Sequence, residues 1–197
     1  MFFDLKVLLF LALSALGIRL AVVWLSDRQD QRQNPQAAST SAGADTYTGL
    51  RNQILHLKRE KIGLSAPAKP TEPWAAAMDW GVTNGTATVV AISDGTASIY
   101  LSSGGGSIGG GQSHDSIRKA AKRMVSIAAE LQPQMSAAHT YPLPQPSQVT
   151  FYVLTDAGVF TASAPQEELN SHRRALSRLG DAAQDIITQY RLIQKSQ

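Results

Sequence analysis

The longest apolar stretch of the chain lies near its start. Residues 7–25 are almost entirely apolar, and a helix needs about 20 such residues to cross a bilayer. Trp24 lies at one end, where amphipathic rings favour the membrane interface, and the long stem of Arg19 lets its charge reach the polar side. A cleaved signal peptide is the alternative, but residues 13–15 make a poor cleavage site and the apolar run continues past them. We therefore expect a membrane anchor over residues 1–27.

The pattern becomes polar after the anchor. Residues 28–49 are rich in Gln, Ala, Ser and Thr without apolar periodicity, which is typical of a flexible linker. Residues 50–64 carry apolar side chains at helical spacing, with Arg51 among the basic residues assigned to the opposite face. This predicts an amphipathic helix that lies either on an acidic membrane surface or against the folded domain. Prolines then predict a stiff connector over residues 65–73.

Short runs of apolar and β-branched residues, bounded by turn residues, indicate strands in the rest of the chain. Asn84-Gly85 and Asp94-Gly95 predict tight turns, because these residues tolerate the positive φ of a type I′ hairpin. The predicted strands are residues 74–82, 86–92, 96–101, 149–154 and 159–164. Apolar stripes at helical spacing predict helices over residues 115–132 and from 165 to about 190.

These elements predict one soluble α+β domain over residues 74–193. We expect a small antiparallel sheet of about five strands, in the order β-β-β-α-β-β-α, with helices packed on it. This order is similar to that of small sensor, scaffold and adaptor folds of the profilin, roadblock or PAS-like kind. The similarity is one of element order.

The candidate chemistry lies in a stretch of residues 102–116, which holds six glycines between a strand and a helix. It can be aligned with a dinucleotide fingerprint, with a Walker-like pattern that has Gln112 in place of lysine, and with a hydrolase elbow around Ser107. The predicted surroundings of the stretch do not fit these motifs. The preceding strands are expected to be antiparallel, whereas a dinucleotide site needs parallel ones, and the domain is too small for a hydrolase fold. We therefore expect no catalytic residues, and the sequence favours a protein that is not an enzyme.

Anion binding is the chemistry that remains for this stretch. Bare glycines expose backbone N–H groups, and a helix N-terminus carries partial positive charge. Four cations near the start of the following helix oppose its macrodipole, which a bound anion would relieve. The alternative is a simple crossover between strand and helix. The candidate anion-binding residues are Gly104, Gly105, Gly106, Ser107, Gly109, Gly110, Gly111, Ser113, Arg118 and Lys122.

Composition removes several other function classes. The absence of cysteine excludes disulfides, thiolate catalysis and cysteine zinc sites, and the four histidines lack ligand spacing, so we expect no metal and no cofactor. A net charge of +3 is too small to indicate nucleic-acid binding.

We expect a single-pass membrane protein, held in the membrane by residues 7–25, whose domain is a non-catalytic interaction or sensory module with a protein partner. The alternative is a small-molecule anion or nucleotide binder. Lys and Arg are nearly balanced across the span, so the sequence does not place the domain on one side of the membrane.

Overall fold

The computed structural model of the chain describes residues 35–195, with their side chains from residue 43 onward. The predicted anchor over residues 1–27, including its span 7–25, lies outside the described residues. Between residues 35 and 195, no helix combines the length and the hydropathy needed to cross a membrane.

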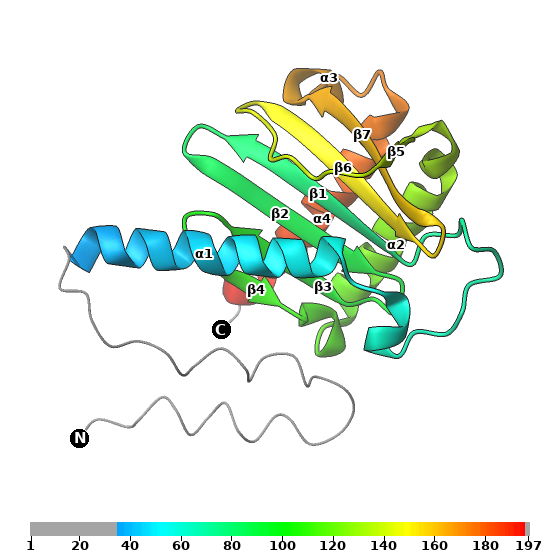
Figure 1. Cartoon of the computed structure of the whole chain (residues 1–197), viewed down its shortest axis with the longest axis horizontal. Helices are drawn as coiled ribbons and strands as arrows, with labels where there is room; N and C mark the ends of the chain where they lie inside the picture. The colour runs from blue at the N-terminus through cyan, green and yellow to red at the C-terminus, as the bar shows by residue number, and fades with distance from the viewer. Residues whose placement is uncertain (1–34, 196–197) are drawn as a thin grey trace.

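The domain is built on one antiparallel sheet of seven strands, which confirms the predicted α+β fold class (Figure 1). The strands lie in the order β4-β3-β2-β1-β6-β7-β5. The five predicted strands are present as β1 Ala75–Val82, β2 Gly85–Ile92, β3 Ala97–Leu101, β6 Gln148–Thr155 and β7 Gly158–Pro165.

The predicted count of about five strands was too low. Two short edge strands, β4 Gly106–Ile108 and β5 Ser136–Ala138, extend the sheet at its two ends. Each has three residues, too few to show a period of two, and each lies in a segment whose glycine or proline content favours a loop. Short edge strands also limit pairing with other chains.

Helices cover both faces of the sheet. On one face lie α2 Asp115–Leu131 and α4 Ala175–Lys195, which bury Phe151 of β6 and their own apolar stripes in the larger core. On the other face α1 Pro35–Leu55 crosses the strands and buries Tyr152 and Val90 in a second core (Figure 1). Because successive strand residues point to opposite faces, both cores use the same strands.

The helix before the domain lies earlier in the chain than the sequence indicates. The described helix α1 runs through residues 35–49, which were predicted as linker, and ends at Leu55; only a short 3₁₀ turn, Arg59–Ile62, follows. Tyr47, Ile54 and Leu55 are buried on the sheet, so tertiary packing stabilises a segment whose own helical periodicity is weak.

The C-terminal helical region is interrupted. In place of the single helix predicted from residue 165 to about 190, the chain forms α3 Gln166–Asn170 and then α4, with residues 171–174 between them. His172 has φ 54° in that break, a left-handed conformation that ends α3. Gly180 lies inside α4 and is buried there.

Candidate functional site

The glycine stretch forms a hairpin and a crossover. Residues 102–105 turn the chain, β4 returns along β3, and a 3₁₀ turn at Gly110–Gln112 leads into α2. The structure therefore places the ten predicted anion-site residues in one continuous segment along the sheet edge and the start of α2.

Several of the glycine N–H groups donate hydrogen bonds inside the domain. The N–H of Gly104 donates to the carbonyl of Leu101 at 2.9 Å, and the N–H of Gly109 donates to Ser98 Oγ at 3.3 Å. The N–H of Gly110 donates to the Tyr190 hydroxyl at 2.9 Å, and that hydroxyl donates in turn to the carbonyl of Ala97 at 2.7 Å. These bonds attach the glycine stretch to β3 and α4.

The two predicted cationic residues differ in their surroundings. Arg118 forms an ion pair with Asp115 and donates to the carbonyl of Gln112 at 2.9 Å, while its aliphatic stem lies against Gly95. Lys122, one turn further along α2, is exposed. The N-cap residue of α2 is His114, which makes no side-chain cap bond.

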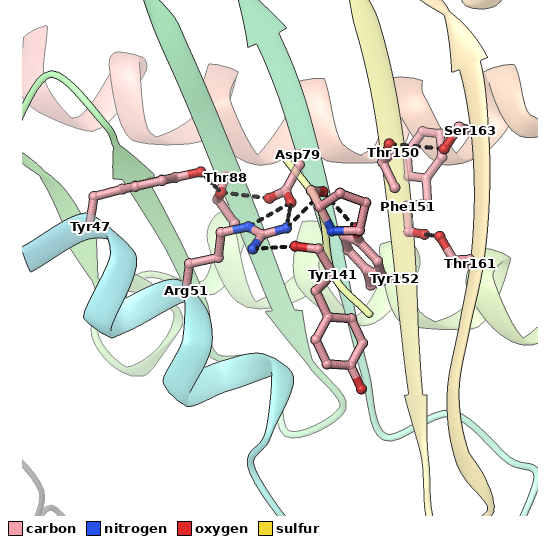
Figure 2. Close-up of polar contacts among 11 residues, drawn as sticks. Tyr47, Arg51, Asp79, Thr88, Tyr141, Thr150, Phe151, Tyr152, Thr161 and Ser163 are labelled. Carbon is pink, nitrogen blue, oxygen red and sulfur yellow. Dashed lines mark hydrogen bonds and ion pairs between the residues drawn. The ribbon is translucent and has the colours of Figure 1, made fainter. Parts of the chain in front are cut away.

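A second polar cluster, which the sequence did not predict, lies under α1. Arg51 and Asp79 are 4% and 0% exposed, and Arg51 Nε donates to Asp79 Oδ2 at 2.7 Å (Figure 2). Thr88 Oγ1 donates to Asp79 Oδ1 at 2.6 Å and lies 3.0 Å from the Tyr47 hydroxyl. Because the single Thr88 proton goes to the carboxylate, the Tyr47 hydroxyl is the donor to Thr88.

Arg51 also holds the proline-rich connector between β5 and β6. Its Nη1 donates to the carbonyl of Tyr141 at 3.0 Å and its Nη2 to the carbonyl of Pro142 at 3.3 Å. The Tyr152 hydroxyl donates to the same Pro142 carbonyl at 3.0 Å, and the Arg51 guanidinium carbon lies 5.6 Å from the centre of the Tyr152 ring. One guanidinium therefore joins α1, the sheet and the connector (Figure 2).

Burial dominates the electrostatics of this cluster. It raises the pKa of Asp79, while the hydrogen bonds and the charge of Arg51 act in the opposite direction. Burial likewise raises the pKa of Tyr47 and of Tyr152. Each charged group has its partners within the cluster, so the arrangement fixes elements to one another and offers no free acid or base to a substrate.

Other hydroxyls on this sheet face are also engaged. Thr150 Oγ1 and Ser163 Oγ lie 2.9 Å apart on β6 and β7, and Thr161 Oγ1 donates to the Phe151 carbonyl at 2.9 Å (Figure 2). In the part of the chain that the structure describes, no group of three His, Asp or Glu side chains could hold a metal ion.

The sequence did contain a signal for the cluster. Asp79 is an acid inside the otherwise apolar strand 74–82, and Arg51 stands four residues after Tyr47 and four before Leu55, both of which are buried. Arg51 therefore belongs to the buried stripe of its helix, whereas its charge had placed it on the opposite, basic face.

Comparison of the chain with protein-family models, with curated proteins and with solved structures found no match. What the chain does must therefore be inferred from the geometry of its own residues.

Proposed function

We propose that the chain is a non-catalytic interaction or sensory module that residues 7–25 anchor in a membrane. The observation that carries the proposal is the closed cluster around Arg51. Helix α1 begins shortly after the predicted span, and Arg51 fixes it to β1 and to the connector at distances of 2.7–3.3 Å. A domain attached in this way is held close to the membrane and presents its remaining surface to partners.

The same cluster argues against catalysis. A general acid or base must reach the proton that it transfers, yet Arg51 and Asp79 are almost completely buried and bonded to each other. Ser107, the residue of the hydrolase hypothesis, lies in β4, paired with Ile99 rather than on a strand-to-helix elbow.

Two comparisons test the proposal with the full chain, expressed with a C-terminal affinity tag in its source cells. First, the full chain should stay in the membrane fraction after alkaline washing, whereas a variant lacking residues 7–25 should not. Second, cross-linking before mild detergent extraction should yield a partner in near-stoichiometric amount with the full chain. A tagged control of residues 1–34 should not yield it. Loss of the full chain from the membrane, or recovery of the chain alone, would contradict the proposal.

Anion or nucleotide binding is the second candidate function. It is supported by Lys119 and Lys122, which are exposed near the start of α2 and form no ion pair within residues 43–195. Millimolar inorganic phosphate, nucleoside triphosphate or anionic lipid should then stabilise the full chain against unfolding, by about 2.7 kcal/mol at a hundredfold excess over Kd. Lys122→Ala should remove the shift and Arg191→Ala, on the exposed face of α4, should keep it. If none of these anions shifts the unfolding midpoint of the full chain, anion or nucleotide binding is excluded.

A further inference from the structure

The connector between β5 and β6 contains a strict alternation with proline. Residues 141–146 read Tyr-Pro-Leu-Pro-Gln-Pro. Each proline fixes its own φ near −65°, and the residue before a proline is sterically disfavoured from the α region. Both restraints favour polyproline II geometry at consecutive positions, so this backbone is extended by its covalent structure rather than by pairing in the sheet.

The exposure of the side chains follows the same geometry. Tyr141 and Pro144 are half-buried, whereas Pro142, Leu143, Gln145 and Pro146 are exposed. A polyproline II helix has three residues per turn, so residues 141 and 144 share the edge that faces the domain. The other two edges point outward, and Leu143 is 49% exposed on one of them.

The domain holds this segment in place at both ends. Arg51 and Tyr152 donate to its first carbonyls, those of Tyr141 and Pro142. Further along, the backbone passes so close to β1 that a Cβ at Gly81 would lie 2.1 Å from the Gln145 carbonyl oxygen. A turn closed by the bond from the Gln148 N–H to the same carbonyl, at 3.0 Å, then ends the segment.

We propose that residues 141–146, the polyproline segment, are the docking ligand of this module, and that its partner is a protein with an aromatic-lined groove for polyproline II helices. Such grooves accept proline rings and an apolar side chain from an extended ligand, and a ligand already fixed in that shape loses less conformational entropy on binding. Residues 139–148 contain no Asp, Glu, Lys or Arg, so recognition depends on ring packing and hydrogen bonds, not on charge. This inference rests on the proposed interaction function and names its partner class.

A second proline series in the chain shows that spacing alone does not make such a ligand. Pro67, Pro70 and Pro73 are three residues apart, but the chain turns there, with the Glu72 N–H bonded to the Lys69 carbonyl at 2.9 Å. Pro73 is buried. Only the segment fixed by Arg51 presents proline and leucine outward in an extended form among the described residues.

The test uses photo-cross-linking in the source cells with the full chain. p-Benzoylphenylalanine replaces Leu143 in one version and Leu192, an exposed leucine of α4 that is 55% exposed, in the matched control. The expected result is a cross-link from position 143, and not from 192, to a protein residue that neighbours Trp or Tyr side chains in the partner.

Affinity for that purified partner should then fall about tenfold or more with Leu143→Ala and change less than about twofold with Leu192→Ala. It should be nearly independent of salt between about 0.05 and 0.5 M, because no charge is involved. A cross-link from position 143 to lipid or to a second copy of the chain, or none at all, overturns the inference. If the cross-linking capture with the full chain still recovers a partner, the proposed function stands and only the polyproline segment is excluded.

Discussion

Arg51 is the residue on which the position of α1 depends. A buried ion pair adds little net stability compared with apolar residues of the same size, because both charges lose their hydration. What it adds is geometry, since a misplaced guanidinium would leave Asp79 charged and unpaired in the core. Arg51 also satisfies two carbonyls of the connector, so the hydrogen bonds of one guanidinium fix the helix and the polyproline segment together.

Replacing Arg51 should therefore cost far more than replacing an exposed arginine. Arg51→Met leaves the Asp79 carboxylate buried without its partner and should lower the free energy of unfolding by about 3–5 kcal/mol. Arg191→Met, on the exposed face of α4, should change it by less than about 0.5 kcal/mol. Urea denaturation of the full chain in detergent micelles, followed by tryptophan fluorescence, measures both.

A double variant identifies the cause of the loss. Arg51→Met combined with Asp79→Leu removes both charges and should recover much of the stability that Arg51→Met loses. Equal losses for Arg51→Met and Arg191→Met would show that the guanidinium is not buried against Asp79.

The sequence contained a signal for each residue of the ion pair, but it could not show that the two residues are partners. Hydrophobic periodicity treats a charge as a surface residue, and a buried charge is permitted only by a partner, here 28 residues away in the chain. By contrast, the position of the first hairpin was predictable, since β1 and β2 do meet beside Asn84-Gly85. The predicted turn geometry was wrong: the two loop residues are Thr83 and Asn84, Gly85 pairs with Val82, and Asn84 does not take the positive φ of a type I′ turn.

At the scale of elements, local sequence patterns predict most of the helices and strands, whereas the position of α1 depends on contacts with residues distant in the chain. The five longer strands are marked by apolar and β-branched runs between turn residues, and α2 by its apolar stripe, and all are present. Helix α1 has almost no amphipathic pattern, and the sheet face that it covers is formed by residues far along the chain. Its boundaries therefore follow from tertiary packing, which outweighs the linker-like composition of residues 35–49.

Gly49 gives a direct test of helix α1. It is exposed in the middle of the helix, and a Cβ there would meet no atom within 4 Å. Gly49→Ala should therefore raise the free energy of unfolding by roughly 0.8–1 kcal/mol, through the helix propensity of alanine. Gly63→Ala is the matched control, since its site is equally open but its φ is +72°, so it should destabilise the domain. If Gly49 lay in a flexible linker, as the sequence indicated, Gly49→Ala would leave the free energy of unfolding unchanged.

At the scale of the whole molecule, one sheet separates two cores, and tyrosines lie in or beside both. Tyr47, Tyr100 and Tyr152 belong to the α1 side, and Tyr190 joins α4 to the glycine stretch on the other. Burial raises the pKa of all four above the ordinary value of 10.0. The fold therefore resists ionisation of these four tyrosines.

This predicts a loss of stability on the alkaline side. As the pH rises above about 10, tyrosines of the unfolded chain ionise first, while the folded chain keeps its protons until the higher folded pKa values are reached. The contribution of these tyrosines is complete below pH 10 and is lost as the pH rises through the folded pKa values. In that window each tyrosine lowers the free energy of unfolding by about 1.4 kcal/mol per pH unit.

Urea denaturation between about pH 8 and 11.5, with tyrosinate absorbance at each pH, measures this loss. Tyr190→Phe is the matched variant. It should be less stable than the parent chain near pH 8, because the Gly110 N–H and the Ala97 carbonyl lose their shared partner, which costs about 1–3 kcal/mol. Its stability should then decline less steeply above pH 10, since one titrating group is gone. Parallel declines for the two proteins would show that the Tyr190 hydroxyl is not held inside the fold. They would also contradict the attachment of the glycine stretch to α4 through that hydroxyl.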